Sequence, residues 1–187
     1  MPPPAAMVVL DDGRLRLSPW QATDIEGLHQ AVQESVAEVG RWLPWCTRDY
    51  DLAQAADWVA ASQAAWASGA ACAFAIRANA DRRLLGGCGL GELDRKHRVG
   101  NLGYWVRSSA HGGGVATAAA RLVAAFGFHQ LGLGRIEIAT LTDNLASRRV
   151  AAKLGAQYEG VARARLWAWG CAHDAAMHGL VPQDLGA

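Results

Sequence analysis

Residues 111–128 read HGGGVATAAARLVAAFGF, so three consecutive glycines stand directly before a run of strong helix formers. The segment NLGYWV at 101–106 precedes them and has the apolar, aromatic composition of a strand. A strand, a turn without side chains and a helix start, in that order, indicate a site for an anion such as phosphate. The helix contributes its positive end and free backbone N–H groups, and glycine lets the backbone approach the ligand. A flexible surface turn before a helix is the alternative.

Two common phosphate-binding motifs do not fit this glycine run. The P-loop pattern GxxxxGK[ST] needs a lysine, and none follows these glycines. The dinucleotide fingerprint needs a third glycine three residues after the second, but Gly114 is followed there by Thr117. Its acidic residue belongs at the end of the next strand, whereas Glu137 falls inside the strand expected at 134–141. Both nucleotide-binding motifs therefore fail on residues that their mechanisms require.

The composition favours a single cytoplasmic domain. A chain of 187 residues, 51% of them hydrophobic, can bury one sizeable core. A net charge of +1 gives no electrostatic reason to expect nucleic acid as a partner. No apolar segment is long enough for a membrane span, and residues 1–10 lack the pattern of a signal peptide. The four cysteines lie far apart without CxxC spacing, which predicts buried free thiols and no metal site.

The hydrophobic patterns predict an α+β domain with one mixed sheet. Capping-box pairs open the first two helices, Thr23 with Glu26 and Asp51 with Gln54. A single domain spans 1–187, and residues 1–13 are interpreted as an N-terminal extension. The expected strands are 14–20, 72–78, 82–93, 100–107, 134–141, 158–169 and 173–181, and the expected helices are 23–38, 51–67, the glycine run to 130, and 144–155.

The segment GYWVRSSAHGGGVATAA resembles the acyl-CoA signature of the GNAT superfamily of N-acetyltransferases, R/Q-x-x-G-x-G/A. The matching positions are His111, Gly114 and Ala116, and the histidine departs from the usual Arg or Gln. RWLPW (41–45), NLASRRVAAKLGAQYEG (144–160) and WGCAHD (169–174) are similar to segments of the RimJ/RimL-type branch, the ribosomal-protein N-terminal acetyltransferase-like proteins. The resemblance covers about residues 14–181. It implies a GNAT-like domain with a mixed, mostly antiparallel sheet of about seven strands flanked by about four helices.

The resemblance also implies acetyl-CoA as co-substrate, with no metal. The glycine loop would bind the pyrophosphate, and the strand before it would pair with the pantetheine and hold the thioester carbonyl. The cofactor-binding residues expected on this basis are Trp105, Val106, His111, Gly112, Gly113, Gly114, Val115, Ala116, Thr117 and Asn144.

The expected catalytic residues are Ser147 and Glu92. The resemblance makes Ser147 the acid that protonates the coenzyme A thiolate, with Asn144 on the pantetheine arm; a plain helix N-cap is the alternative. Many relatives carry Glu where this chain has Asn101, which cannot take a proton. Glu92 and Asp94 are the nearest carboxylates, although an exposed strand end would also explain them. A missing base favours an α-amine acceptor, since its ordinary pKa of about 7.7–8.0 leaves it partly neutral.

Trp42 and Trp45 lie where the RimJ/RimL-type branch builds its acceptor wall, although a core role would explain them equally. Residues 33–59 carry five acids and two arginines, which favours a cationic amine or else marks a solvated helix face. The sequence thus predicts an N-acetyltransferase acting on a protein N-terminal amine by direct transfer in a ternary complex, with a homodimer as one possible assembly. The alternatives are a small-amine acetyltransferase for an antibiotic or polyamine, and a non-catalytic acyl-CoA-binding module.

Overall fold

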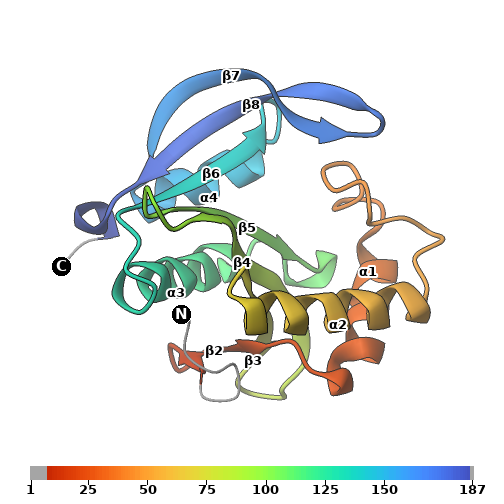
Figure 1. The fold of residues 1–187 in the computed structure, drawn as a ribbon. Coiled ribbons are helices and arrows are strands. Elements are labelled where there is room, and N and C mark those ends of the chain that lie inside the picture. The colour runs from red at the N-terminus through yellow and green to blue at the C-terminus, as the bar shows by residue number, and fades with distance from the viewer. Residues whose placement is uncertain (1–7, 186–187) are drawn as a thin grey trace.

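The computed structural model describes residues 8–185, which form one α+β domain with a mixed eight-stranded sheet and four α-helices (Figure 1). The strands are β1 (Leu10–Asp11), β2 (Leu15–Pro19), β3 (Cys72–Ala78), β4 (Leu84–Asp94), β5 (Val99–Val106), β6 (Arg135–Leu141), β7 (Gln157–Ala168) and β8 (Cys171–Leu180). The helices are α1 (Ile25–Ser35), α2 (Leu52–Ser68), α3 (Val115–His129) and α4 (Leu145–Leu154). The predicted fold class and order of elements are confirmed.

The eighth strand is β1, which the sequence patterns did not predict. It pairs with β2 through Leu10 opposite Leu17 and Asp11 opposite Arg16. Two residues are too few to show alternation, so the pairing is visible only in three dimensions. The extension expected over residues 1–13 lies partly outside the described residues. Within its described part, the side chain of Val8 is buried in the core.

The strand order is β1-β2-β3-β4-β5-β6-β8-β7, and every neighbouring pair is antiparallel except β5 and β6. The parallel pairing of β5 and β6 is short, because only residues 99–101 of β5 pair with residues 135–137 of β6. Beyond Asn101 the two strands separate, while β6 continues to pair with β8 up to Leu141 (Figure 1). The sheet therefore opens at its middle, between the C-terminal half of β5 and β6.

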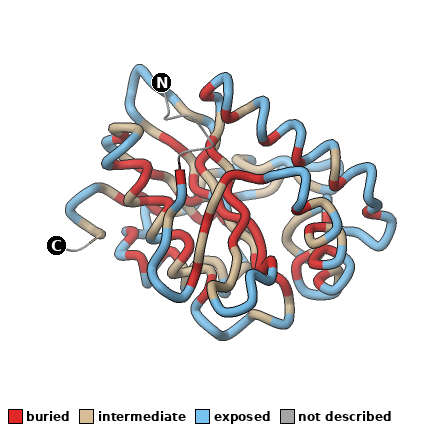
Figure 2. The backbone as a smooth tube through the Cα atoms, turned by 90° about the horizontal axis from the view of Figure 1, so that it is seen from below, coloured by how far each residue is buried: buried red, intermediate tan, exposed pale blue. Residues whose placement is uncertain are grey.

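The helices cover both faces of the sheet. Along β3, Phe74 and Ile76 join the core cluster that contains α3 and α4, while Ala73 and Ala75 pack with the cluster of α1 and α2. Because successive side chains of a strand point to opposite faces, α3 and α4 lie on one face and α1 and α2 on the other. Figure 2 shows the buried residues concentrated in the central strands and on the inward sides of the helices. Gly127 of α3 permits close packing, since a Cβ there would meet Leu90 of β4 at 2.8 Å.

The two predicted capping boxes have different outcomes. In α2, Asp51 and Gln54 exchange side chain-to-backbone hydrogen bonds of 2.8 and 2.9 Å, as predicted. In the first helix the prediction is wrong, because the reciprocal pair is Gln21 with Asp24. The Asp24 carboxylate accepts from the N–H of Gln21 and pairs with Arg77 of β3, so a 3-10 turn at 22–24 precedes α1.

Two further observations concern the cysteines and the length of the helices. All four cysteines are free thiols, and three of them, Cys46, Cys72 and Cys88, are buried. Within residues 8–185, no helix combines the length and the apolar character needed to cross a membrane.

Candidate active site

The glycine run forms the loop that leads into α3, as the sequence predicts. Gly112 and Gly114 have left-handed backbones with φ of +77° and +73°, a conformation that glycine adopts without strain. The first helical hydrogen bond runs from the N–H of Ala118 to the carbonyl of Gly114. Among the described residues, none accepts a hydrogen bond from the N–H groups of residues 112–117. Free N–H groups at the positive end of a 15-residue helix form a suitable cradle for phosphate oxygens.

Cationic side chains surround this loop. The guanidinium of Arg14 donates to the carbonyl of Gly113 at 2.8 Å, although Arg14 lies almost one hundred residues away in the sequence. A second hollow of about 410 Å³ adjoins the loop at Gly114 and Thr117, and Arg121 and Lys153 line it. Arg14, Arg121 and Lys153 are binding candidates that the motif did not indicate. Isolated cations carry no local pattern, so only the fold brings them together.

His111 points away from the helix start. Its Nε2 donates to the carbonyl of Val106 at 2.7 Å, so the imidazole lies against the end of β5. Its expected place at the phosphates stays a prediction. The side chain of Val115 is buried in the core and Ala116 packs partly against it, so these two contribute to the loop through their N–H groups.

The backbone of β5 faces the opening in the sheet. The N–H of Arg107 donates to the carbonyl of Leu85 at 2.8 Å, so that residue pairs with the strand before it. Since hydrogen-bonding direction alternates along an antiparallel strand, Trp105 also faces β4, while Tyr104 and Val106 turn their backbone groups toward β6. The N–H of Val106 is therefore available as a donor in the opening between β5 and β6. The side chain of Trp105 lies on the α1–α2 face of the sheet.

Ser147 and Tyr104 meet across the opening. The Tyr104 hydroxyl lies 3.0 Å from both the Oγ and the carbonyl oxygen of Ser147. Burial raises the pKa of Tyr104 to about 12, so this hydroxyl stays protonated at neutral pH. Asn144 caps α4, its Oδ1 accepting from the N–H of Ser147 at 3.0 Å, which fixes the serine in the first turn. Tyr104 was missed from the sequence, where its place two residues before Val106 is the only available signal.

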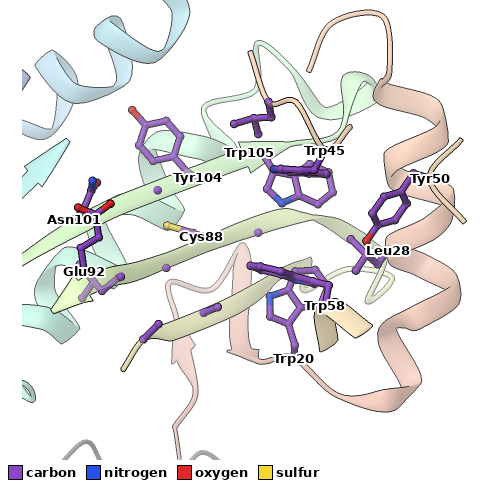
Figure 3. Close-up of a pocket in the computed structure, with 18 residues that line it drawn as sticks. Trp20, Leu28, Trp45, Tyr50, Trp58, Cys88, Glu92, Asn101, Tyr104 and Trp105 are labelled. Carbon is purple, nitrogen blue, oxygen red and sulfur yellow. The ribbon is translucent and has the colours of Figure 1, made fainter. Parts of the chain in front are cut away.

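A cavity of about 600 Å³ lies on the opposite side of β5, between the α1–α2 segment and strands β4 and β5 (Figure 3). Five aromatic side chains dominate its wall, Trp20, Trp45, Tyr50, Trp58 and Trp105, and Tyr104 borders it from the other face of β5. Because Tyr104 lines the cavity and also contacts Ser147, the cavity extends to the opening between β5 and β6. A ligand in the cavity can therefore approach a group bound along β5.

The floor of this cavity lacks side chains. Gly87, Gly89 and Gly91 of β4 pair with Trp105, Gly103 and Asn101 of β5, so all of them belong to the α1–α2 face. At Gly91 and Gly103 no atom lies within 4 Å of a hypothetical Cβ, which shows open space above the strand. The open patch of backbone at Gly91 and Gly103 thus lies next to the tryptophans, toward Glu92, while the rings of Trp20 and Trp105 cover Gly87.

The two expected acceptor tryptophans have different surroundings. Trp45 lines the cavity and packs edge-on against Trp105, with ring centroids 5.5 Å apart. Trp42 is not among the lining residues, and its ring lies under the guanidinium of Arg41 at 5.7 Å. The role of Trp42 in acceptor binding stays a prediction.

Glu92 and Asn101 lie at the end of the cavity away from the tryptophans (Figure 3). The Glu92 carboxylate accepts from Arg165 of β7 at 2.9 Å and is mostly exposed. This ion pair links the β7–β8 hairpin to the cavity. Asp94 instead bonds the ring of His97 and does not line the cavity.

The acids at 33–59 do not line the cavity, so they give no support to a cationic acceptor. Glu34 bonds Arg107 and the N–H of Ser109, and the Arg107 bonds lower the pKa of its carboxyl to about 2. Glu38 accepts from Ser108, and Asp51 caps α2. Glu34 and Glu38 thus connect α1 to the segment before α3, and Asp51 stabilises the start of α2.

The family is established by a direct match. The family model described as "Acetyltransferase (GNAT) domain" matches residues 14–157, so the chain belongs to this family of acetyltransferases. A Bacillus subtilis (strain 168) protein named "Putative ribosomal N-acetyltransferase YdaF" is 34% identical over 104 residues, which is 56% of this chain and 57% of that protein. The chain thus matches little more than half the length of this relative.

Solved structures confirm the fold. Mycobacterium smegmatis RimJ in complex with CoA-disulfide has a TM-score of 0.81 at 24% identity, covering 92% of this chain and 84% of that one. The microcin C7 self immunity acetyltransferase MccE in complex with acetyl-CoA and AMP has a TM-score of 0.83 at 18% identity, covering 91% and 93%. The resemblance to RimJ/RimL-type proteins is therefore confirmed.

Proposed function

We propose that this protein is an acetyl-CoA-dependent N-acetyltransferase that transfers the acetyl group directly to an α-amine in a ternary complex. The observation that carries the proposal is the opening between β5 and β6. The glycine loop lies at one end of β5, the Tyr104–Ser147 pair crosses the opening, and the aromatic cavity lies behind the strand.

The residues around the glycine loop fit the coenzyme A part of the acetyl donor, acetyl-CoA. Free N–H groups at 112–117 and the Arg14 guanidinium supply donors for a pyrophosphate, and Arg121 and Lys153 add positive charge nearby. The N–H groups of Tyr104 and Val106 face the opening and can pair with an extended amide-containing arm, while the Val106 carbonyl already accepts from His111. The complexes of RimJ with a CoA disulfide and of MccE with acetyl-CoA support this assignment.

The chemistry then follows from three groups. The amine nitrogen attacks the thioester carbonyl carbon, and the N–H of Val106 stabilises the developing negative charge on the carbonyl oxygen. When the C–S bond breaks, the thiolate takes a proton from the Ser147 hydroxyl, and the Tyr104 O–H replaces it. Solvent then returns a proton to Tyr104, which balances the proton that the amine releases. The amine loses its proton to water, or to Glu92 at the cavity end. An α-amine with a pKa of about 7.7–8.0 is already partly neutral, so this deprotonation needs little assistance.

The acceptor has two candidate sources. The printed name of YdaF refers to a ribosomal acetyltransferase, which supports a protein N-terminus. The aromatic cavity of about 600 Å³ supports a small molecule, because pockets of about 300–1,000 Å³ hold ligands of that size. Cytoplasmic localisation and a homodimer stay predictions.

An acetyl-transfer screen tests the function. Purified protein with acetyl-CoA is offered peptides with free N-termini and small primary amines, and release of the free thiol is followed. We expect thiol release that depends on the amine, together with an acetylated product of the expected mass. Tight binding of acetyl-CoA without transfer to any amine would instead support the binding-module alternative.

A further inference from the structure

The acceptor cavity is much larger than a small N-terminal residue needs. Its volume of about 600 Å³ falls within the range of pockets that enclose ligands of drug size. The methyl of alanine or the hydroxymethyl of serine would leave most of this space filled only by water. Water against indole and glycine surfaces gains few hydrogen bonds, so a larger apolar group is favoured there.

The walls of the cavity are rings, and these rings are gathered at one end. Figure 3 shows Trp45 and Trp105 close together above β4, with Trp20 and Trp58 below and Tyr50 beside them. These side chains come from the segment after β2, the α1–α2 segment, α2 and β5. Aromatic rings prefer other aromatic rings in offset or edge-to-face arrangements, so the end with the tryptophans suits a flat ring.

The floor matches that shape. Gly91 and Gly103 expose backbone with open space above it, as described above. This open backbone lies between the tryptophans and Glu92, since Gly91 pairs with Asn101 while the rings of Trp20 and Trp105 already cover Gly87. A flat ring at the tryptophan end can extend over it at van der Waals distance, whereas a branched or bulky aliphatic group makes less contact. Shape and lining thus point to the same kind of ligand.

Charge selects the other end of the ligand. Among the lining residues that the structure describes, Glu92 carries the only carboxylate, and it lies with Asn101 at the end away from the tryptophans. Tyr104, the residue that contacts Ser147, also lines this side. An amine at this end would lie near the opening, with its apolar group pointing toward Trp20 and Trp58. Because Glu92 pairs with Arg165 at 2.9 Å, a free carboxylate beside the amine would compete with Glu92 for this guanidinium, whereas a blocked carboxyl leaves the ion pair intact.

We infer that the acceptor is an aromatic α-amine: an α-amino group attached to a carbon that carries an aromatic side chain, with its carboxyl blocked as an amide or a peptide bond. The inference rests on the proposed function and specifies its substrate class. The shared chemistry has two sources, a small aromatic amide or a polypeptide that begins with an aromatic residue. The ring occupies the tryptophan end, and the amino group lies toward Tyr104.

The test is a set of matched acceptors with the wild-type protein. Alaninamide, leucinamide, phenylalaninamide and tryptophanamide are compared at saturating acetyl-CoA, together with hexapeptides that begin with Ala or Phe. We expect kcat/KM for the two aromatic amides to exceed that of alaninamide by about tenfold or more, as an added ring contact commonly provides. The Phe-starting peptide distinguishes the sources: it matches phenylalaninamide if a polypeptide is accepted and fails if the site takes small molecules.

Two variants assign the preference to the cavity. Trp58→Leu removes a ring that lines the cavity and is about half exposed, and Trp167→Leu is its control, a β7 tryptophan that is 76% exposed and outside the lining. Trp58→Leu should reduce kcat/KM for phenylalaninamide about tenfold, a larger loss than for alaninamide, with the KM of acetyl-CoA unchanged, while Trp167→Leu should match the wild type.

The outcomes separate the two proposals. Equal activity on alaninamide and phenylalaninamide, or equal losses in both variants, would overturn the inference and leave the proposed function intact. If no amine is acetylated, calorimetry with phenylalaninamide in the presence of coenzyme A decides. Binding that Trp58→Leu weakens supports the aromatic site while the transfer function fails, and no binding overturns both.

Discussion

On the α3–α4 face of the sheet the candidate site consists mainly of backbone groups, whereas on the α1–α2 face it consists of side chains. The glycine loop offers N–H groups at 112–117, and β5 adds the N–H of Val106. The aromatic cavity is instead walled by five aromatic side chains above a glycine floor. The first arrangement suits a donor that a whole family shares, and the second can change with each acceptor through a few substitutions.

The largest effect is expected from a substitution in the glycine loop, where the site consists of backbone N–H groups. Gly114→Val places a branched side chain at φ of +73°, which L residues rarely adopt, and turns the loop N–H groups away from a bound anion. We expect coenzyme A binding to fall at least about a hundredfold, measured by calorimetry on a variant shown to be folded by circular dichroism.

The control for this variant is Gly170→Val. Gly170 has a similar φ of +76° and open space around its Cβ, but lies in the β7–β8 turn. It introduces comparable strain away from the loop. Unchanged coenzyme A affinity in a folded Gly114→Val protein would show that the loop is only a turn before a helix.

A smaller effect is expected at the contact between the two halves. Ser147→Ala removes the proposed proton donor and should lower kcat about a hundredfold, the low end of general-acid contributions, with coenzyme A affinity little changed. Tyr104→Phe keeps Ser147 and removes only the hydroxyl 3.0 Å from its Oγ, so we expect a loss of about tenfold or less. Steady-state kinetics on a verified acceptor measure both. If Ser147→Ala kept the wild-type kcat, the Ser147 hydroxyl would have no role in proton transfer, and the residue would only be part of the start of α4.

The smallest effect is expected on the stability of the fold, at the ion pair between Glu34 of α1 and Arg107, which precedes the glycine loop. Arg107 lowers the pKa of Glu34 from 4.5 to about 2, so the pair stabilises the fold above pH 4.5 and loses this contribution as the pH falls toward 2. Glu34→Gln should cost about 2 kcal/mol at neutral pH, allowing for solvent screening of a partly exposed carboxylate.

The measurement for Glu34→Gln is urea unfolding at pH 7 and at pH 3. The difference from wild type should shrink at the lower pH, because below pH 4.5 the unfolded wild-type chain binds a proton at Glu34, whereas the folded protein keeps this carboxyl ionised down to about pH 2. Glu26→Gln, on the exposed side of the same helix, is the control and should stay near the wild type at both values. An equal deficit at pH 7 and pH 3 would contradict the assigned role of the ion pair.

The sequence predicted what depends on local pattern. Periodicity and capping residues placed the four helices and seven of the eight strands, because each is encoded by its own residues. The glycine loop was found for the same reason, since three glycines before a helix have few other uses. The sequence also placed Ser147 in the first turn of α4. Asn144 caps that helix, as the alternative interpretation had it, and its contact with the pantetheine arm stays a prediction.

The rest depends on contacts between distant segments. Tyr104 reaches Ser147 only because β5 separates from β6, and no residue pattern marks where a parallel pair ends. Gly87, Gly89 and Gly91 look like a flexible strand in the sequence, and become a floor only under tryptophans from other elements. Glu34 looked like part of an acidic acceptor surface until its partner Arg107 was visible 73 residues away.

The central claim is that the two halves bind separate substrates and meet only at β5. Gly103→Leu tests it most directly, because its side chain would enter the open space of the cavity without meeting the glycine loop. Calorimetric titration of coenzyme A into this variant should give the wild-type affinity, while transfer to phenylalaninamide falls at least about tenfold. A loss of coenzyme A affinity equal to the loss of transfer would show that the cavity and the loop belong to one site, and would contradict the account.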